Sequence, residues 1–336
     1  GNDDTYTVEY ETDGQSVNIV YSDATKGWLP LEDDVTALEP VAPPTQKAIF
    51  AYGYNASGAG RLSMSNLVNS SGVVAADVTG VGTARMTIAA TSYGGDKAIF
   101  GYGDSGSATN LSNLVSSSGV IASDTTGVGT ARYAPAAASY DGDKGIFGYG
   151  DTGGDSYVSL TNLVNNSGVI ATDTTGVGTA RRYLAATGYG SSGQAVFAYG
   201  STGSRLSMKN LVSNSGVVAS DATGVGSARN NLAAVKYGTD KAIFGYGSTG
   251  SITGVTNLVS NVGVIASDVS GVGTARQYLA AASYGGDKAL FGYGNTASGA
   301  VSMTNLVNNS GVVGSDVTGV GSVRETLGAA GYSTSA

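Results

Sequence analysis

The sequence of 336 residues contains no cysteine and no histidine. The lack of cysteine excludes disulfides, and the lack of both residues leaves zinc fingers, blue-copper sites and haem-type sites without ligands. Cys–His and Ser–His–Asp nucleophile systems are also excluded, because no imidazole is present to take the proton. Carboxylates, lysine, arginine, tyrosine and hydroxyl groups are the side chains left for chemistry. We therefore expect no bound metal and no cofactor.

Long apolar runs are absent as well, and none reaches the roughly 18 residues that a membrane-spanning helix needs, so we expect no membrane insertion. Glycine, by contrast, is abundant at 53 residues, and no segment shows capped apolar spacing with a period of 3.6. Glycine this dense destabilises long helices. The composition favours an all-β protein.

Charge of one sign is concentrated at one end of the chain. Residues 1–44 hold ten of the 25 acids and one of the 17 bases, whereas the remainder is nearly neutral. The net charge of −8 is therefore a property of this acidic N-terminal arm, and no basic surface for nucleic acid is expected. The prolines of Glu39-Pro-Val-Ala-Pro-Pro44 mark a linker, since paired prolines force extended backbone.

Alternating residues within the arm flank Asp13-Gly14, which predicts a β-hairpin. The chain begins Gly1-Asn2-Asp3-Asp4, with neither methionine nor a secretory signal. This start indicates a processed or truncated chain, or a piece of a longer protein. We interpret residues 1–44 as an attachment arm and residues 45–336 as the main domain.

One unit is repeated six times through residues 45–336. Asn-Leu-Val recurs at Asn66, Asn113, Asn162, Asn210, Asn257 and Asn305. A Gly-Val-Gly segment ends 19 residues after each asparagine at Arg85, Arg132, Arg181, Arg229, Arg276 and Arg324. All six phenylalanines occupy one position, in Lys-Ala-Ile-Phe-Gly-Tyr-Gly or a close variant. A period of 47 to 49 residues is typical of propeller blades.

The pattern of each repeat predicts four short antiparallel strands joined by turns of glycine and asparagine. The first strand is rich in alanine, which suits the crowded axis of a propeller. The first repeat lacks this strand, whereas the chain ends on one, so we expect Thr326–Tyr332 to pair with Lys47–Tyr52. The sequence thus predicts a six-bladed β-propeller of four-stranded blades, closed by its two terminal strands.

The repeat resembles the Kelch pattern, in which an arginine, an apolar strand, a turn and hydrophobic residues lead to a glycine pair. Here the pair is Gly-Tyr-Gly and valine replaces the Kelch tryptophan, as in a divergent relative. Asp-Lys-Ala-Ile-Phe-Gly-Tyr-Gly, Asn-Leu-Val and Gly-Val-Gly-Thr-Ala-Arg are also similar to repeats in virion proteins of tailed bacteriophages. This resemblance covers residues 45–336, and a weaker one covers 5–30. It implies a structural or host-recognition role, without catalytic residues.

Several recurrent motifs have ordinary structural interpretations. Gly101-Tyr-Gly-Asp-Ser-Gly106 fits a dinucleotide-binding pattern, but no helix is expected after it, so turn chemistry is favoured. The repeated arginine is expected to bind backbone carbonyls or aspartates where blades meet. Six aspartates precede the Gly-Val-Gly turns and are expected to cap turns by accepting backbone N–H bonds: Asp77, Asp124, Asp173, Asp221, Asp268 and Asp316.

The six copies differ mainly in two places. The segment between the second and third strands varies in length, and the two residues after each repeated arginine vary in identity. Antiparallel alternation puts both on one face of the propeller, whereas the turns of the other face are nearly uniform. Neutral drift would produce such variation, since loops tolerate change. The alternative is a recognition surface.

The candidate binding residues of this variable face are aromatic or polar. They are Tyr54, Tyr133, Asp151, Asp155, Tyr157, Arg182, Tyr183, Asn230, Asn231, Gln277, Tyr278 and Glu325. We expect a non-enzymatic virion or extracellular protein, a tail-fibre or appendage module that recognises a host-surface glycan or protein. The arm would bind other virion proteins in a multi-chain assembly. A purely structural decoration or connector is the main alternative, and a polysaccharide hydrolase is a more distant one.

Overall fold

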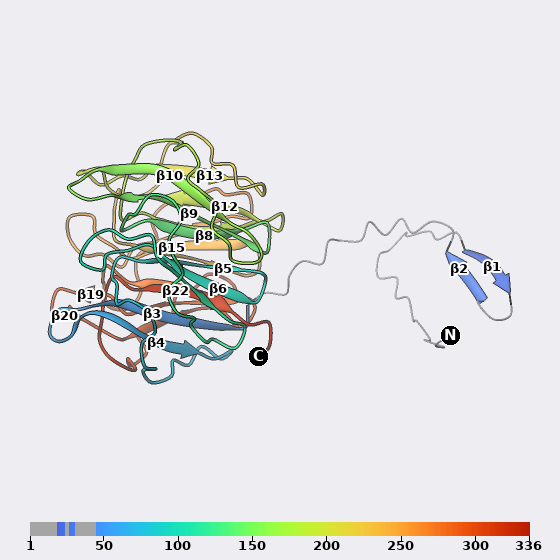
Figure 1. The fold of residues 1–336 in the computed structure, drawn as a ribbon, viewed down its shortest axis with the longest axis horizontal. Helices are drawn as coiled ribbons and strands as arrows, with labels where there is room; N and C mark the ends of the chain where they lie inside the picture. Colours follow the sequence, from blue (N-terminus) through green and yellow to red (C-terminus); the bar gives the residue numbers. More distant parts are fainter. Residues whose placement is uncertain (1–18, 24–26, 31–44) are drawn as a thin grey trace. The chain divides into compact units, whose positions relative to one another are not determined.

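The computed structural model describes residues 19–23, 27–30 and 45–336 (Figure 1). By its contacts the chain divides into two compact units, Gly1–Val41 and Ala42–Ala336. No helix long and apolar enough to cross a membrane occurs in these described ranges.

In the first unit, β1 (Ile19–Asp23) pairs with β2 (Gly27–Pro30) in an antiparallel arrangement. The hairpin predicted around Asp13-Gly14 and the proline linker at 40–44 lie outside the described residues.

Residues 45–336 fold entirely as β-structure in six three-stranded antiparallel sheets, numbered here 1 to 6. Their strands, in the order first, second and third, are as follows. Sheet 1 contains β22 (Gly328–Tyr332), β3 (Lys47–Asn55) and β4 (Gly60–Val68); sheet 2 contains β5 (Ala89–Tyr93), β6 (Lys97–Gly101) and β7 (Ser112–Val115); sheet 3 contains β8 (Ala136–Tyr140), β9 (Lys144–Asp151) and β10 (Tyr157–Val164). Sheet 4 contains β11 (Ala185–Tyr189), β12 (Gln194–Ala198) and β13 (Lys209–Val212); sheet 5 contains β14 (Ala233–Tyr237), β15 (Lys241–Gly245) and β16 (Thr256–Val259); sheet 6 contains β17 (Ala280–Tyr284), β18 (Lys288–Gly292) and β21 (Thr304–Val307). A small hairpin of β19 (Asn295–Thr296) and β20 (Gly299–Ala300) lies in the loop of sheet 6.

Sheet 1 is built from both ends of residues 45–336. Strand β22 pairs with β3, with Gly328 opposite Ala51 and Tyr332 opposite Lys47. The predicted pairing of the terminal strands is therefore confirmed, and Figure 1 shows the red β22 beside the blue β3.

The first strands contact one another in cyclic order, from β22 through β5, β8, β11, β14 and β17 back to β22. Backbone hydrogen bonds join the segments that follow their C-terminal ends in the same order. Gly94 N donates to Asp143 O at 2.6 Å, for example, and Ser333 N donates to Asp96 O at 2.7 Å. A second set of backbone bonds, described below, joins the N-terminal ends of the same six strands. The six strands therefore run in one direction.

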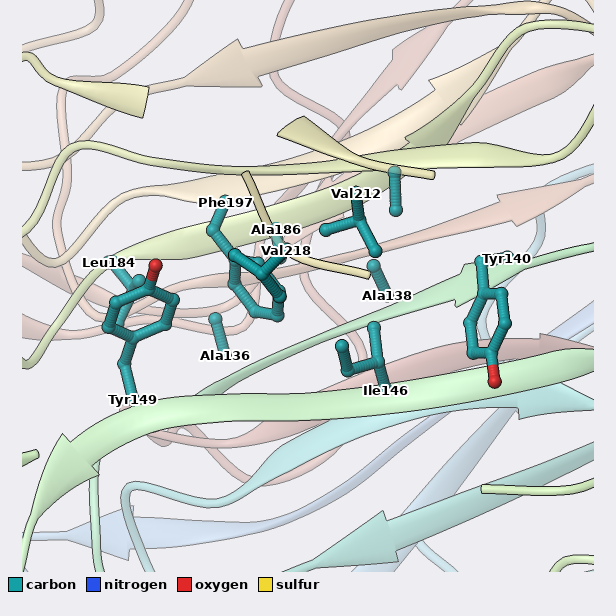
Figure 2. Close-up of a cluster of buried hydrophobic side chains, with 11 residues drawn as sticks. Ala136, Ala138, Tyr140, Ile146, Tyr149, Leu184, Ala186, Phe197, Val212 and Val218 are labelled. Carbon is teal, nitrogen blue, oxygen red and sulfur yellow. The ribbon is translucent and has the colours of Figure 1, made fainter. Parts of the chain in front are cut away.

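The hydrophobic core lies between neighbouring sheets. Figure 2 shows the cluster in which Tyr149 of sheet 3 faces Phe197 of sheet 4, with ring centroids 5.2 Å apart. The same tyrosine–phenylalanine contact recurs between every pair of neighbouring sheets, including Phe50 of sheet 1 with Tyr293 of sheet 6. The invariant aromatic positions of the repeat therefore join sheets to each other.

The six repeated arginines are completely buried. Arg181 donates to Asn210 Oδ1 at 2.8 Å and to two backbone carbonyls, those of Thr179 and Tyr199. Its guanidinium carbon lies 4.3 Å from the ring centroid of Tyr149, in the preceding sheet. Five of the six arginines donate to a backbone carbonyl, and Arg229 instead lies 3.7 Å from Asp268. The prediction that they bind carbonyls or aspartates where sheets meet is confirmed, and their burial leaves them unavailable to an external anion.

The aspartates before the Gly-Val-Gly segments accept backbone N–H bonds from such turns, as predicted, but the turn belongs to the neighbouring repeat. Asp77 accepts hydrogen bonds from the backbone N–H and the hydroxyl of Ser322, at 2.9 Å and 2.7 Å. A Cβ at Gly321 would collide with this carboxylate, which explains the glycine next to Ser322. Burial alone would raise the pKa of Asp77, but these bonds, the Asn66 amide and the Arg324 charge lower it.

The predicted fourth strand of each blade is not formed as a continuous strand. In sheet 1 the segment after β4 makes only two isolated bridges, Val68 to Val74 and Ser65 to Val78. Between them the Asn66 side chain donates to Ala75 O and to Asp77 Oδ1, both at 2.9 Å. One backbone bond remains between the bridges, from Ala75 N to Leu67 O at 2.8 Å, and the side-chain bonds replace the rest of the pairing. The same arrangement recurs in the other five sheets.

Candidate functional site

The N-terminal ends of the first strands meet in a ring of backbone hydrogen bonds. The second residue after each repeated arginine donates its N–H to the carbonyl of the equivalent residue in the preceding sheet, at 2.8 to 3.2 Å, so that six bonds form a complete cycle. The residues, here named the ring residues, are Thr87, Ala134, Tyr183, Asn231, Tyr278 and Thr326.

All six ring residues adopt left-handed backbone, with φ between 50° and 56°. Glycine or asparagine accepts this conformation most readily, and β-branched or bulky residues are rare in it. Only Asn231 matches that preference, whereas Thr87 and Tyr183 do not. The hydrogen-bond ring fixes the backbone conformation of all six residues. Local conformational preference does not explain which side chains occur at these positions.

The ring residues surround a small hollow, here called the central hollow, of about 80 Å³. Its deeper wall consists of the apolar residues that follow them in the chain: Ile88, Pro135, Leu184, Leu232, Leu279 and Leu327. Tyr183 and Tyr278 form an aromatic wall on one side, with ring centroids 6.0 Å apart at 73°. Thr87, Ala134 and Thr326 carry small side chains on the other side. The hollow is therefore lopsided, although the backbone repeats around it.

Arg182 organises a cluster beside this aromatic wall. It binds the fully buried Asp151 at 2.6 Å and the exposed Asp155 at 2.8 Å. Its guanidinium lies between the rings of Tyr157 and Tyr183, at 5.2 Å and 5.1 Å from their centroids. These contacts neutralise the arginine and fix the orientation of both rings.

Two further tyrosine hydroxyls complete the cluster. Tyr133 donates to Asp151 Oδ2 at 3.1 Å, and Tyr157 donates to Asp155 Oδ1 at 3.2 Å. Asp151 also accepts the backbone N–H of Gly153 at 2.7 Å, so this buried carboxylate is fully engaged. Six predicted residues from sheets 3 and 4 are thus brought together: Tyr133, Asp151, Asp155, Tyr157, Arg182 and Tyr183.

The phenols beside the hollow are neutral at physiological pH. Burial raises the pKa of Tyr183 to about 12, and the nearby Tyr278 adds to this effect while Arg182 opposes it. Burial also raises the pKa of Tyr278, with a further contribution from Glu325. Both hydroxyls therefore remain able to donate and to accept hydrogen bonds.

The other predicted residues lie at the same end but outside the Arg182 cluster. Asn231 Nδ2 lies 3.4 Å from both Asn230 Oδ1 and Gln277 Oε1. Glu325 forms an isolated bridge with Tyr54 in sheet 1, and burial raises the pKa of its carboxyl group. No side-chain contact joins Tyr54 to the cluster among the described residues.

Sequence reasoning missed Thr87, Ala134 and Thr326 as site residues. Their small side chains did not suggest binding, although their repeat position was recognised as variable. The signal that could have found them is the position itself, since all six equivalents share the ring. Arg61 and Asp104 were also missed, and they form a second ion pair at this end, with Nη2 and Oδ1 3.0 Å apart.

The opposite end carries a larger open hollow of about 600 Å³, between sheets 3 and 4. Tyr140, Leu163 and Asn214 are among its lining residues. The surrounding turns are those that are nearly uniform among the repeats, so this hollow serves below as a control location.

The variable end combines aromatic rings, neutral hydroxyls, an amide and a paired ion cluster. No group of three or more acids in the described ranges is placed to hold a metal ion. No helix follows Gly101–Gly106, as a dinucleotide site would require. Comparison of the sequence with models of known protein families and with curated proteins finds no match.

Proposed function

We propose that residues 45–336 form a six-bladed Kelch-like β-propeller whose variable end recognises carbohydrate. The cyclic contacts of the first strands and the hydrogen-bond rings at both of their ends support the propeller. The pairing of β22 with β3 supports its closure by the chain termini. The missing fourth strands leave each blade with three strands and two bridges.

One observation supports recognition above all others. Tyr183, Tyr278, Thr87 and Thr326 occupy left-handed backbone that their side chains disfavour. Conformations of this kind cost about 1–3 kcal/mol each and persist only where the surrounding structure enforces them. The buried tyrosines of the repeat, such as Tyr52, share this conformation but are the same in all six copies, whereas the ring residues differ. Fold stability alone would favour asparagine or glycine at all six ring positions. The choice of tyrosine and threonine there is explained if these side chains contact a ligand.

The chemistry of the variable end fits a sugar better than a protein. Sugars present C–H faces that pack on aromatic rings and hydroxyls that bond to fixed polar groups. Tyr183 and Tyr278 supply the rings, and the Arg182 cluster fixes the ring of Tyr183, which contacts that of Tyr278. A ligand that meets immobilised side chains loses less entropy on binding.

The biological setting rests on the sequence resemblance of residues 45–336. We propose a non-enzymatic virion protein of a tailed bacteriophage, a tail-fibre or appendage module that acts outside the host cell. Its acidic arm, residues 1–44, would attach it to other virion proteins in a multi-chain assembly.

A glycan array of bacterial surface polysaccharides tests the proposal. The full chain should bind at least one polysaccharide, and Tyr183→Ala with Tyr278→Ala should weaken binding at least tenfold without lowering the melting temperature. Lys144→Ala with Asn214→Ala, at the opposite end, is the matched control and should bind normally.

Other outcomes would point elsewhere. Binding to none of the polysaccharides would favour the alternative of a structural connector. Equal binding by the tyrosine double variant and the natural protein would show that the variable end does not bind the polysaccharide. Release of reducing ends from a bound polysaccharide would show a hydrolase.

A further inference from the structure

The central hollow differs from the rest of the variable end in its size and in its hydrogen-bonding groups. Resting on the proposed function, we infer that it is the subsite for one uncharged terminal sugar, which enters with its free end first. The protein would thus recognise the end of a glycan chain rather than an internal stretch.

The volume of the hollow is the first argument for a terminal sugar. Pockets that enclose a whole small molecule measure about 300–1,000 Å³. The central hollow measures about 80 Å³, and the apolar residues that line it, such as Leu184 and Leu232, are nearly buried. A hollow of this volume cannot enclose a whole sugar residue, whereas one end of a sugar ring can enter it.

The hydrogen-bonding groups of the ring residues are the second argument, because they favour a ligand with hydroxyl donors. The hydroxyls of Thr87 and Thr326 each donate to the carbonyl of the preceding residue at 2.7 Å, so only their acceptor capacity remains. Asn231 Oδ1 is buried, and it has no hydrogen-bond partner among the described residues. A buried acceptor without a partner costs free energy until a donor reaches it. The hollow therefore suits a ligand rich in hydroxyl donors.

The charges around the hollow are the third argument, because they favour an uncharged sugar. Arg182 is already paired with Asp151 and Asp155, and the other charges that act on Tyr278, Glu325 and Arg205, are of opposite sign. An anionic sugar would therefore meet carboxylates, and an amino sugar would meet guanidinium groups. An uncharged sugar avoids both repulsions and can pack a C–H face on Tyr183 or Tyr278.

Saturation-transfer NMR on the full chain tests this inference with defined probes. The uncharged probes are the methyl glycosides of glucose, galactose, mannose and rhamnose; methyl glucuronide and methyl glucosaminide are the charged ones. At least one uncharged glycoside should receive saturation, whereas the two charged glycosides should receive several-fold less.

Ala134→Tyr is the decisive variant, because it fills the open side of the hollow. The repeat already holds tyrosine at this position in sheets 4 and 6 with the same backbone conformation, so the variant is expected to fold. It should abolish saturation transfer. Ser298→Tyr, in an exposed loop of sheet 6, is the matched control and should leave the signal unchanged.

A second variant keeps the test decisive if Ala134→Tyr does not fold. Asn231→Leu removes the unpartnered acceptor at similar volume, and it should reduce the signal at least fivefold. Undiminished signal in the folded variants, preference for a charged glycoside, or no signal from any glycoside would overturn the inference. The proposed function would survive each of these results if the array still showed binding that depends on Tyr183 and Tyr278.

Discussion

A chain that ends at Arg324 is expected to be unfolded at room temperature. The truncation removes β22 and with it Leu327 and Tyr332, which are 5% and 2% exposed. It also removes Thr326 from the ring around the central hollow and Ser333 from the ring at the opposite end. No other part of sheet 1 replaces these contacts.

The size of the effect follows from simple magnitudes. Burial of Leu327 and Tyr332 contributes about 3–6 kcal/mol in total, and each lost backbone hydrogen bond adds about 1 kcal/mol. A domain is stable by only about 5–15 kcal/mol. The exposed edge of β3 would in addition promote aggregation.

Circular dichroism during heating measures this outcome. The truncated chain should show no cooperative transition, whereas a chain that lacks only the exposed residues 334–336 should melt within a few degrees of the intact protein. A cooperative transition in the chain that ends at Arg324 would show that sheet 1 does not depend on its terminal strand.

Replacement of a single buried arginine is expected to have the second-largest effect. In Arg181→Ala, the oxygen atoms of Asn210, Tyr199 and Thr179 lose their donor inside the protein. Each unsatisfied buried acceptor costs about 1–3 kcal/mol. A cavity also forms against the ring of Tyr149. We expect a loss of about 3–5 kcal/mol, as when one partner of a buried charged network is removed.

Urea unfolding gives the free energy directly. Arg181→Lys keeps the charge but presents a compact ammonium in place of the planar fork, so it should restore less than half of the loss. Arg205→Ala, at an exposed arginine on the loop of sheet 4, is the control and should change stability by less than about 1 kcal/mol. A loss below 1 kcal/mol for Arg181→Ala would contradict the role assigned to the buried arginines.

Regular spacing in the sequence was sufficient to predict much of the fold. The alanine-rich, phenylalanine-containing and Asn-Leu-Val segments are the first, second and third strands of six sheets. The missing first strand before Lys47 and the unpaired one after Arg324 correctly predicted that β22 pairs with β3. Such predictions succeed because antiparallel strands and their turns are specified by short-range pattern.

The failures share a physical cause, which is that tertiary contacts override local preference. The segment after each third strand has the composition of a strand, yet Asn66 and its equivalents occupy the positions where pairing would occur. The left-handed ring residues could not be predicted either, since their conformation depends on hydrogen bonds between six sheets. The central hollow follows from that ring, so its position was not predictable although its variable residues were noticed.

The central claim is that the residues repeated in all six copies stabilise the fold, whereas the residues that differ among the copies at one end bind the ligand. A chain in which the other five ring residues become asparagine, as at Asn231, tests it directly. Asparagine suits the left-handed ring, so this chain should melt at or above the temperature of the natural protein. On the glycan array it should bind none of the polysaccharides that the natural protein binds. Unfolding of this chain, or retained binding, would contradict the claim.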